Sequence, residues 1–209
     1  LTFFKKRTKN TINLEQYKFK KVQQIAQSLP KETIKTTIQK MEKAGDLLFS
    51  SGDYKIFFTK IDNKPKLLHE IGRLREITFR SVGEGTMKSI DSDHYDQYYH
   101  HLILWDDQTN AIAGAYRLGL GKEIYQKYGI NGFYIHELFH LQDNMHEMMS
   151  EAIEMGRSFI TKEYQQKPTP LFNLWKGIMM VAQQYPDHKY LIGAASISND
   201  FSDCSKSFI

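Results

Sequence analysis

The segment at residues 151–160, "EAIEMGRSFI", decides the fold, because its β-branched and aromatic residues predict a strand that three other residues interrupt. Glu154 and Arg157 are charged, and Gly156 between them has no side chain to pack. In a regular strand, residues 154 and 157 would point to opposite faces, since the side-chain period is two. A glycine inside a strand often marks a bulge, which shifts the register by one residue. The segment therefore predicts a bulge at Gly156 that brings Glu154 and Arg157 to one face and leaves backbone N–H groups free for a ligand.

Strands and helices alternate along the rest of the chain. Two strands joined by the polar turn 107–110 predict a hairpin. A hydroxyl at Thr169 followed by Pro170 predicts the start of a helix. This alternation predicts a mixed sheet flanked by helices. The expected helices cover 14–29, 34–41, 67–80 and the segment from 169 on, and the expected strands cover 53–61, 99–106, 111–120, 151–160 and 190–198.

Composition excludes several classes of protein. The chain has 209 residues, of which 41% are hydrophobic and 25% are charged, so a globular protein is expected. The single cysteine, Cys204, rules out a disulfide framework and fits a reducing cytosol. No apolar run reaches the ~20 residues of a membrane span.

Charge is distributed unevenly along the chain. Residues 1–43 carry eleven Lys or Arg and three Glu, whereas the whole chain has a net charge of only +4, so the remainder is acidic on balance. We therefore expect residues 1–50 to form a basic helical arm or interdomain linker, which either contacts an anionic membrane surface or an acidic carrier, or is simply solvated. No zinc-finger spacing or stripe of basic and aromatic residues indicates nucleic acid.

The sequence "HELFH", His136–His140, matches the H-E-x-x-H pattern of zinc hydrolases. That chemistry needs both histidines on one regular helix and a third ligand downstream. The preceding "GFYI" resembles a strand, and no third ligand stands at a recognisable spacing. Surface histidines and no metal site are therefore expected, with zinc-dependent hydrolysis as an alternative.

A set of charged residues is spread over distant segments. A buried charge is tolerated when it is paired and hydrogen-bonded. Arginines and carboxylates of this set could therefore neutralise one another as a structural network, or together form a catalytic site. The set, together with Phe79, comprises Arg75, Asp93, Asp96, Arg117, Glu154 and Arg157.

The order of these residues resembles the acyl-homoserine-lactone synthases, an acyl-carrier-protein-dependent branch of the GNAT acyltransferases. That branch has the patterns R-x-x-x-F, D-x-x-D, G-x-x-R and E-x-x-R, which match Arg75/Phe79, Asp93/Asp96, Gly114/Arg117 and Glu154/Arg157. A closer resemblance is to the bacterial, hemolysin-like N-acyltransferases that make ornithine and glycine lipids. It rests on "EIGRLREITFRSVGEGT", "EMGRSFITKEYQ", "LWKGI" and "YLIGAASIS", and covers roughly residues 50–209.

The resemblance implies an α+β fold in which a GNAT-like mixed, mostly antiparallel sheet is flanked by helices on both faces. It implies a GNAT-like acyltransferase domain over 51–209, truncated at its C-terminus. The expected reaction moves a long-chain (3-hydroxy)acyl group from acyl carrier protein to the amino group of a small amino acid such as glycine or ornithine, in aminolipid synthesis. A non-catalytic acyl- or carrier-binding domain is the other alternative. The expected location is cytoplasmic, with the basic arm peripheral to the inner membrane.

The chain departs from the ordinary acetyl-CoA cradle, because the loop "TKEYQQKPTP" contains no glycine. A bulky loop cannot bring its backbone close to a pyrophosphate. This favours acyl carrier protein, with its single phosphate, as donor over acyl-CoA, and no other cofactor is expected. Lys162, Lys167 and Lys176 are the residues expected to receive the acidic carrier and its phosphopantetheine.

The resemblance also suggests roles for the charged set. Glu154 is expected to be the general base, with Arg117 and Arg157 keeping it ionised. The oxyanion would be met by N–H groups at the bulge. Arg75, Asp93 and Asp96 would fix the loop over the acceptor, or else an arginine of the set would grip the acceptor's carboxylate.

Three interpretations of Ser158 remain open: it protonates the leaving thiol, binds the pantetheine, or is a satisfied strand hydroxyl. Six large apolar residues, Phe79 among them, are expected to lie mostly in the core, and some of them are expected to line an acyl tunnel. The other members are Phe133, Phe139, Met148, Met149 and Trp175.

Overall fold

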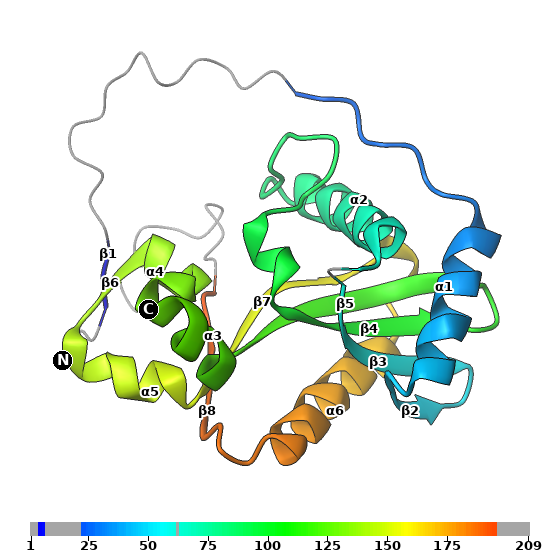
Figure 1. Ribbon diagram of the computed structural model, residues 1–209. Coiled ribbons are helices and arrows are strands. Elements are labelled where there is room, and N and C mark those ends of the chain that lie inside the picture. The colour runs from blue at the N-terminus through cyan, green and yellow to red at the C-terminus, as the bar shows by residue number, and fades with distance from the viewer. Residues whose placement is uncertain (1–3, 7–21, 62, 196–209) are drawn as a thin grey trace.

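The computed structural model describes residues 4–6, 22–61 and 63–195. Its centre is a six-stranded sheet in the order β2-β3-β4-β5-β7-β8, in which every neighbouring pair is antiparallel except β7–β8 (Figure 1). The predicted mixed, mostly antiparallel sheet is therefore confirmed. The strands are β2 (Leu47–Ser51), β3 (Tyr54–Lys60), β4 (His100–Asp106), β5 (Ala111–Leu120), β7 (Ala152–Ile160) and β8 (Tyr190–Gly193).

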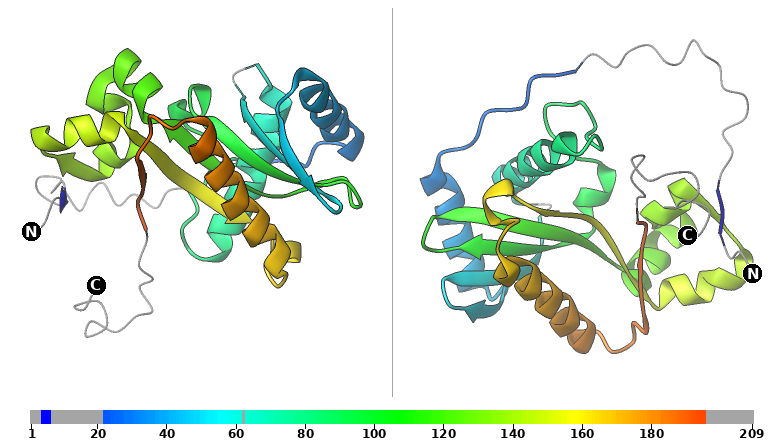
Figure 2. Two further views of the ribbon diagram at one scale, coloured as in Figure 1. Left: turned by 90° about the horizontal axis from the view of Figure 1, so that it is seen from below. Right: turned by 180° about the vertical axis from the view of Figure 1, so that it is seen from behind.

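Helices cover both faces of the sheet (Figure 2). Helices α1 and α2 pack on one face, where their apolar residues meet Ile103 and Trp105 of β4. Helix α6 packs on the other face, against Leu102 and Leu104 of the same strand. This alternation of β4 side chains is what a strand buried on both sides requires. The helices are α1 (Lys31–Ala44), α2 (Pro65–Ser81), α3 (Gly121–Tyr128), α4 (Tyr134–Leu138), α5 (His146–Ser150) and α6 (Pro168–Gln184).

Residues 121–151 form an insert between β5 and β7. It contains α3, α4 and α5, the 3-10 turns η3 (Gly129–Gly132) and η4 (Asp143–Met145), and the short strand β6 (Phe139–Leu141). Strand β6 pairs with β1 (Phe4–Lys6) in a separate two-stranded sheet. A third apolar cluster joins this insert to Tyr95 and Tyr99, beside the turn η2 (His94–Gln97). The remaining turn, η5 (Lys162–Tyr164), follows β7.

Most element predictions are confirmed, with shifts at the ends. The predicted hairpin is β4–β5. Helix α1 ends at Ala44 and is capped by Gly45, whose φ of 87° is left-handed. Residues 22–30 are not helical, so the helix predicted over 14–29 is wrong in its described part; residues 14–21 lie outside the described residues.

Two further ends differ from prediction. Helix α6 starts at Pro168, so Thr169 lies inside it and does not cap it. Strand β8 ends at Gly193, and residues 196–198 of the predicted strand lie outside the described residues. The division at residue 50 stays a prediction, although α1 precedes it, β2 spans it, and both pack against the core of the sheet. No helix in the described part of the chain is long and apolar enough to cross a membrane.

The predicted bulge is present, one residue later than expected. Arg117 of β5 pairs with Gly156 of β7, and Ala115 pairs with Phe159. Between these pairs β5 has one residue and β7 has two, Arg157 and Ser158. The left-handed residue is Arg157, with a φ of 48°, and not Gly156. Strand β7 pairs with β8 only as far as Met155, so the two strands part where the bulge begins.

Two glycines beside the bulge have opposite surroundings, which gives a stability test. A Cβ on Gly114 would lie 2.6 Å from the carbonyl oxygen of Phe159, a backbone atom that cannot move alone. We expect Gly114→Ala to lower the free energy of unfolding by about 1–3 kcal/mol, as overpacking does. A Cβ on Gly156 would meet nothing within 4 Å, so the control Gly156→Ala should fold at least as stably as the parent. Urea denaturation measures the free energy of unfolding of both variants. Equal values for the two would contradict the close approach of β5 and β7 at Gly114.

Candidate active site

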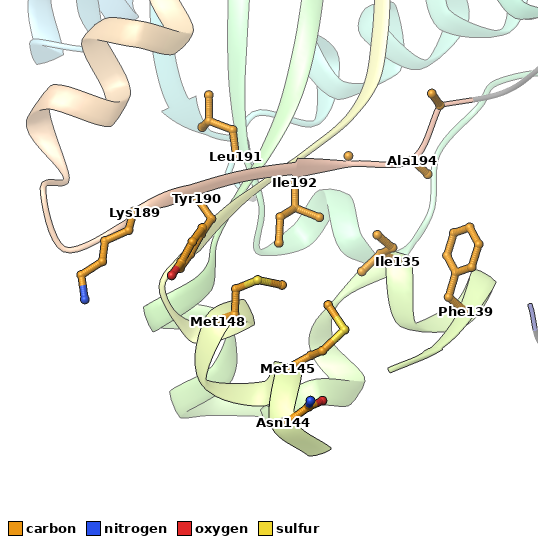
Figure 3. A pocket seen from close by; sticks show the side chains of 12 residues that line it. Ile135, Phe139, Asn144, Met145, Met148, Lys189, Tyr190, Leu191, Ile192 and Ala194 are labelled. Carbon is orange, nitrogen blue, oxygen red and sulfur yellow. The ribbon is translucent and has the colours of Figure 1, made fainter. Parts of the chain in front are cut away.

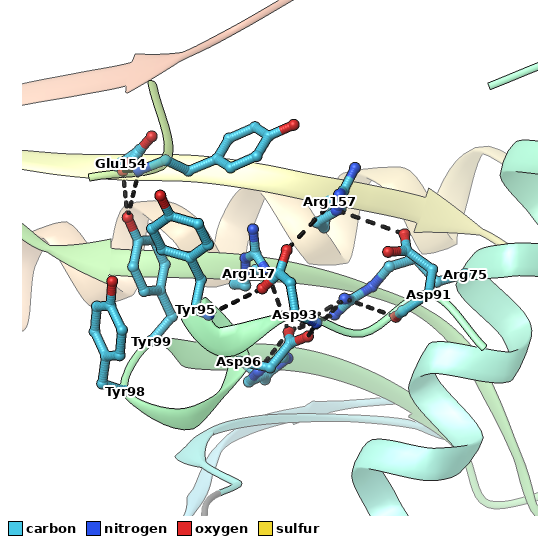
Figure 4. Close-up of polar contacts among 12 residues, drawn as sticks. Arg75, Asp91, Asp93, Tyr95, Asp96, Tyr98, Tyr99, Arg117, Glu154 and Arg157 are labelled. Atoms are coloured by element: carbon cyan, nitrogen blue, oxygen red, sulfur yellow. Dashed lines mark hydrogen bonds and ion pairs between the residues drawn. The ribbon is translucent and has the colours of Figure 1, made fainter. Parts of the chain in front are cut away.

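Two buried arginines share one buried aspartate at the centre of the site (Figure 4). Arg75 of α2 and Arg117 of β5 are each 1% exposed, and Asp96 of η2 is fully buried. Arg75 donates from Nη1 to Asp96 Oδ1 at 3.1 Å and from Nη2 to the same oxygen at 3.2 Å. Arg117 donates from Nη1 to Asp96 Oδ1 at 3.3 Å. Asp96 therefore ties helix α2 and strand β5 to the loop that precedes β4.

Asp93 closes the same loop. Its Oδ1 accepts from the backbone N–H of Tyr95 at 3.0 Å, while the N–H of Asp93 donates to Asp96 Oδ2 at 3.0 Å, which is a capping box. Arg117 Nη1 also donates to Asp93 Oδ1, at 2.5 Å. The predicted partners Arg75, Asp93 and Asp96 therefore fix this loop, and a role of the loop toward an acceptor stays a prediction.

The charges keep this network ionised. Burial alone would raise the pKa of Asp96, but the positive charges of Arg75 and Arg117 outweigh it and hold that pKa below its usual value. His101, fully buried beside Asp96, has its pKa lowered to about 3 by burial and by Arg75. His101 is therefore neutral at physiological pH and adds no charge.

Arg157 is the third arginine, at the rim of the network. Its side chain is 23% exposed, with Nε 3.5 Å from Asp91 Oδ2 and Nη2 3.7 Å from Asp93 Oδ2. Three arginines and three carboxylates from distant segments do converge, but the third carboxylate is Asp91 and not Glu154. The sequence reasoning missed Asp91, although it stands only two residues before Asp93.

Glu154 stands in β7 like Arg157 but has different partners. Its Oε1 accepts from the backbone N–H of Ile135 at 2.6 Å, and its Oε2 accepts from that of Tyr134 at 3.1 Å and from the Tyr99 hydroxyl. Burial raises the pKa of Glu154, and these hydrogen bonds oppose that rise. Because Glu154 is only 3% exposed, the contacts show it holding the first turn of α4. Its role as general base stays a prediction.

Tyr134 contacts both Glu154 and Arg157. Its backbone N–H donates to Glu154, and its ring lies 5.3 Å from the guanidinium carbon of Arg157 and 5.6 Å from that of Arg117. Contacts of this kind are cation–π interactions. Sequence reasoning did not select Tyr134, because it stands in "GFYI", an ambiguous segment remote from the four patterns.

A cleft of about 450 Å³ opens where β7 and β8 part. Of the predicted site residues, Phe79, Arg157 and Ser158 line it, and Ser158 is exposed. Arg75, Arg117 and Glu154 do not line it, nor do Asp93 and Asp96. The remaining lining residues are Glu84, Tyr134, Leu138, Phe139, Met155, Gly156, Ala194 and Ala195.

A larger, mostly apolar cavity of about 760 Å³ adjoins the cleft, since Phe139, Ala194 and Ala195 line both (Figure 3). It lies between β8 and the insert, where Met145 and Met148 project toward the strand. Of the residues expected to line an acyl tunnel, Phe139 and Met148 line this cavity and Phe79 lines the cleft. Phe133 and Met149 are buried core residues, and Trp175 is 46% exposed on α6.

The three lysines predicted to receive a carrier are exposed near the loop after β7 or on α6. Lys167 lies over the ring of Tyr164 at 4.8 Å and Lys176 over that of Phe49 at 4.4 Å, while Lys162 stands in η5. Helix α6 begins at Pro168 and has a second proline at its third position. Since proline lacks an N–H, this first turn offers few donors to a phosphate.

The H-E-x-x-H motif is not on one helix. Helix α4 ends at Leu138, so His136 is helical while His140 stands in β6, opposite Lys5. Among the described residues, no three His, Cys, Asp or Glu side chains are grouped to hold a metal ion. The zinc-hydrolase alternative requires both histidines on one helix, and this requirement is not met. The interpretation as surface histidines fits His140, which is exposed.

Comparison with known proteins agrees with this architecture. Residues 74–176 match the acetyltransferase (GNAT) domain family. The chain is 32% identical over 187 residues to a glycine N(alpha)-acyltransferase of Bacteroides thetaiotaomicron, an alignment covering 84% of the chain and 55% of that protein. It is 31% identical over 184 residues to a glycine N(alpha)-acyltransferase of Phocaeicola vulgatus, an alignment covering 82% of the chain and 56% of that protein. The chain thus spans about half the length of these relatives. The family match covers residues 74–176 of the predicted acyltransferase domain, whose bounds, 51–209, stay a prediction.

The shared aspartate gives a pH-dependent stability prediction. Because the folded protein lowers the pKa of Asp96, this carboxylate contributes stability that is present above the ordinary carboxyl pKa and is lost as pH falls through the lowered value. Asp96→Asn should cost about 3–5 kcal/mol at neutral pH, since it leaves two buried arginines short of a partner. Its stability should also fall less steeply on acidification.

Denaturant titrations between neutral pH and about pH 3 measure both effects. The control is Asp187→Asn, which removes an exposed pair with Lys122 and should leave the stability unchanged. Neutral-pH stability of Asp96→Asn equal to that of the parent would contradict the central role of this residue.

Proposed function

Because the chain contains a GNAT-type acyltransferase domain and is related to two glycine N(alpha)-acyltransferases, we propose that it transfers a long-chain acyl group from a thioester to the amino group of a small amino acid. Glycine is the first candidate, and ornithine the second. The product would be an acylated amino acid of the kind used in aminolipid synthesis. The observation that carries the proposal is the cleft at the parting of β7 and β8, with an apolar cavity beside it.

The reaction needs few groups from the protein. The neutral amine attacks the thioester carbonyl carbon, a C–N bond forms and the C–S bond breaks. The nitrogen gives up one proton and the leaving thiolate takes one up, so the products are an amide and a thiol. Beyond Met155, the edge of β7 that faces β8 has no strand partner among the described residues. Backbone N–H groups along that edge can therefore stabilise the oxyanion. Ser158 is exposed and lines the cleft, and we propose that it binds the pantetheine or protonates the leaving thiolate.

The apolar cavity suits a long acyl chain. It follows β8 and its continuation from Lys189 to Ala195, about 20 Å of extended backbone at ~3.3 Å per residue. Met145 and Met148 line it, and methionine side chains adapt readily to flexible apolar ligands. A chain entering from the cleft passes Phe139, which lines both spaces.

Acyl carrier protein is the proposed donor, with acyl-CoA as the alternative. Two observations support this choice: the loop after β7 contains no glycine, and the first turn of α6 contains two prolines that cannot donate to a phosphate. A nucleotide pyrophosphate would therefore find few backbone donors, whereas Lys162, Lys167 and Lys176 offer positive charge to an acidic carrier. A cytoplasmic location, with the basic arm of residues 1–50 peripheral to an anionic membrane, stays a prediction.

Arg117 and Glu154 are proposed to position the site. Neither lines the cleft, and both oxygens of Glu154 already accept hydrogen bonds. A general base must reach the proton directly or through one water. We therefore assign Glu154 to holding Tyr134, whose side chain does line the cleft.

The reaction is tested by thiol release from long-chain acyl carrier protein and from the matching acyl-CoA, with a panel of amino acids and mass spectrometry of the products. We expect release that depends on glycine, formation of N-acylglycine, and a kcat/KM at least 10-fold higher for the carrier protein, since the CoA phosphates lack their usual donors. Carrier binding without release for any amino acid would overturn the reaction in favour of a binding domain.

Glu154→Gln separates the two roles of that residue. As a positioning residue it should lose about 1–3 kcal/mol of stability, because an NH₂ group replaces an oxygen that accepts backbone hydrogen bonds. Its kcat should fall less than 10-fold at a temperature where it remains folded. A fall of 10²–10⁴ with unchanged thermal stability would instead establish Glu154 as the general base.

A further inference from the structure

Resting on the proposed function, we infer that Arg157 binds the carboxylate of the amino acid acceptor and so selects α-amino acids over other amines. The three arginines of the site differ in how far their donors are used. Arg75 and Arg117 are each 1% exposed, and each makes hydrogen bonds to buried aspartates. These two guanidinium groups are therefore committed to the core and are not accessible to a substrate.

Arg157 is not committed in this way. Its two ion pairs, to Asp91 and Asp93, are 3.5 and 3.7 Å long, and its buried Nε has no hydrogen-bond partner among the described residues. A guanidinium has five N–H donors, and a carboxylate can take two of them in parallel. Arg157 also lines the cleft and is 23% exposed, so an incoming carboxylate can reach it.

The backbone of Arg157 indicates that its position has a purpose. Its φ of 48° lies in the left-handed region, where glycine and asparagine are at ease and a long side chain is uncommon. The ring of Tyr134, 5.3 Å from its guanidinium carbon, holds the group toward the cleft. A strained residue that keeps unused donors at an open cleft is the arrangement expected of a ligand-binding group.

The placement also suits the chemistry. In glycine, the amine is one carbon away from the carboxylate. A carboxylate held by Arg157 therefore puts the amine beside Gly156 and Ser158, where the thioester would lie. Gly156 leaves that space open, because a Cβ there would meet nothing within 4 Å. Among the residues lining the cleft, Arg157 is the cationic one and the exposed Glu84 the acidic one, so the cleft fits a zwitterion.

The test compares glycine with glycinamide, which has the amine but no carboxylate, using one acyl donor and the 209-residue chain. The kcat/KM of the parent should be on the order of 10- to 100-fold higher for glycine than for glycinamide, because this is the effect expected of hydrogen bonds to a charged group. Arg157→Asn is chosen because asparagine tolerates the left-handed backbone. It should raise the KM for glycine by a similar factor and raise the KM for glycinamide much less, so that the preference for glycine is lost. Arg157→Lys should recover part of the preference.

Arg73→Asn is the matched control, because Arg73 pairs with Glu70 at 2.6 Å on α2 and does not line the cleft. It should keep the preference of the parent. A folded Arg157→Asn that still prefers glycine over glycinamide to the same extent would overturn the inference.

Binding of glycine is measured in parallel by ligand-observed NMR, which needs no turnover. Binding that is lost in Arg157→Asn and kept in Arg73→Asn would support the inference even if no acyl transfer occurred, in which case the proposed function alone would fail. Equal binding of glycine to both variants, or none to the parent, would overturn the inference whatever the outcome of the transfer assay.

Discussion

The sharing of Asp96 by Arg75 and Arg117 is the interaction on which the site depends. It joins helix α2, the loop that precedes β4 and strand β5 inside the core, with all three side chains almost fully buried. Buried ion pairs add little net stability, because desolvation offsets their attraction, but removal of one partner is costly. Such a network therefore specifies one arrangement. It also fixes β5 at Arg117, the residue that pairs with Gly156 just before the bulge.

The bulge then determines what the sheet can do. One extra residue in β7 turns Arg157 toward the aspartates and toward the cleft, and β8 leaves β7 at the same level. The resulting space has a polar part near Arg157 and Ser158 and an apolar part along β8 and the insert, joined at Phe139. A zwitterionic acceptor and an acyl chain need these two environments side by side, which a single uniform pocket would not provide.

Much of this could be predicted from the sequence, because patterns of period two and 3.6 locate the strands of the hairpin, α2 and β7. The convergence of three arginines and three carboxylates was also predictable, since lone charges in apolar strands need partners. The position of the left-handed residue in the bulge could not be predicted. Glycine is the usual residue in that conformation, so the sequence points to Gly156, whereas the structure has Arg157 there. Asp91 and Tyr134 cannot be found from the sequence because their roles come from tertiary contacts. The contacts of Glu154 with α4 are likewise tertiary and cannot be read from the sequence, while its role as general base stays a prediction.

The central claim is that an acyl thioester lies between β7 and β8 with its chain in the apolar cavity. The most direct measurement is a crystal structure of the chain with a long-chain acyl-pantetheine thioether, which cannot be cleaved. We expect the sulfur to lie beside Gly156 and Ser158, and the acyl chain to pass Phe139 and end near Met145 and Met148. An acyl chain on the α1–α2 face of the sheet, or a ligand that leaves the cleft empty, would contradict it.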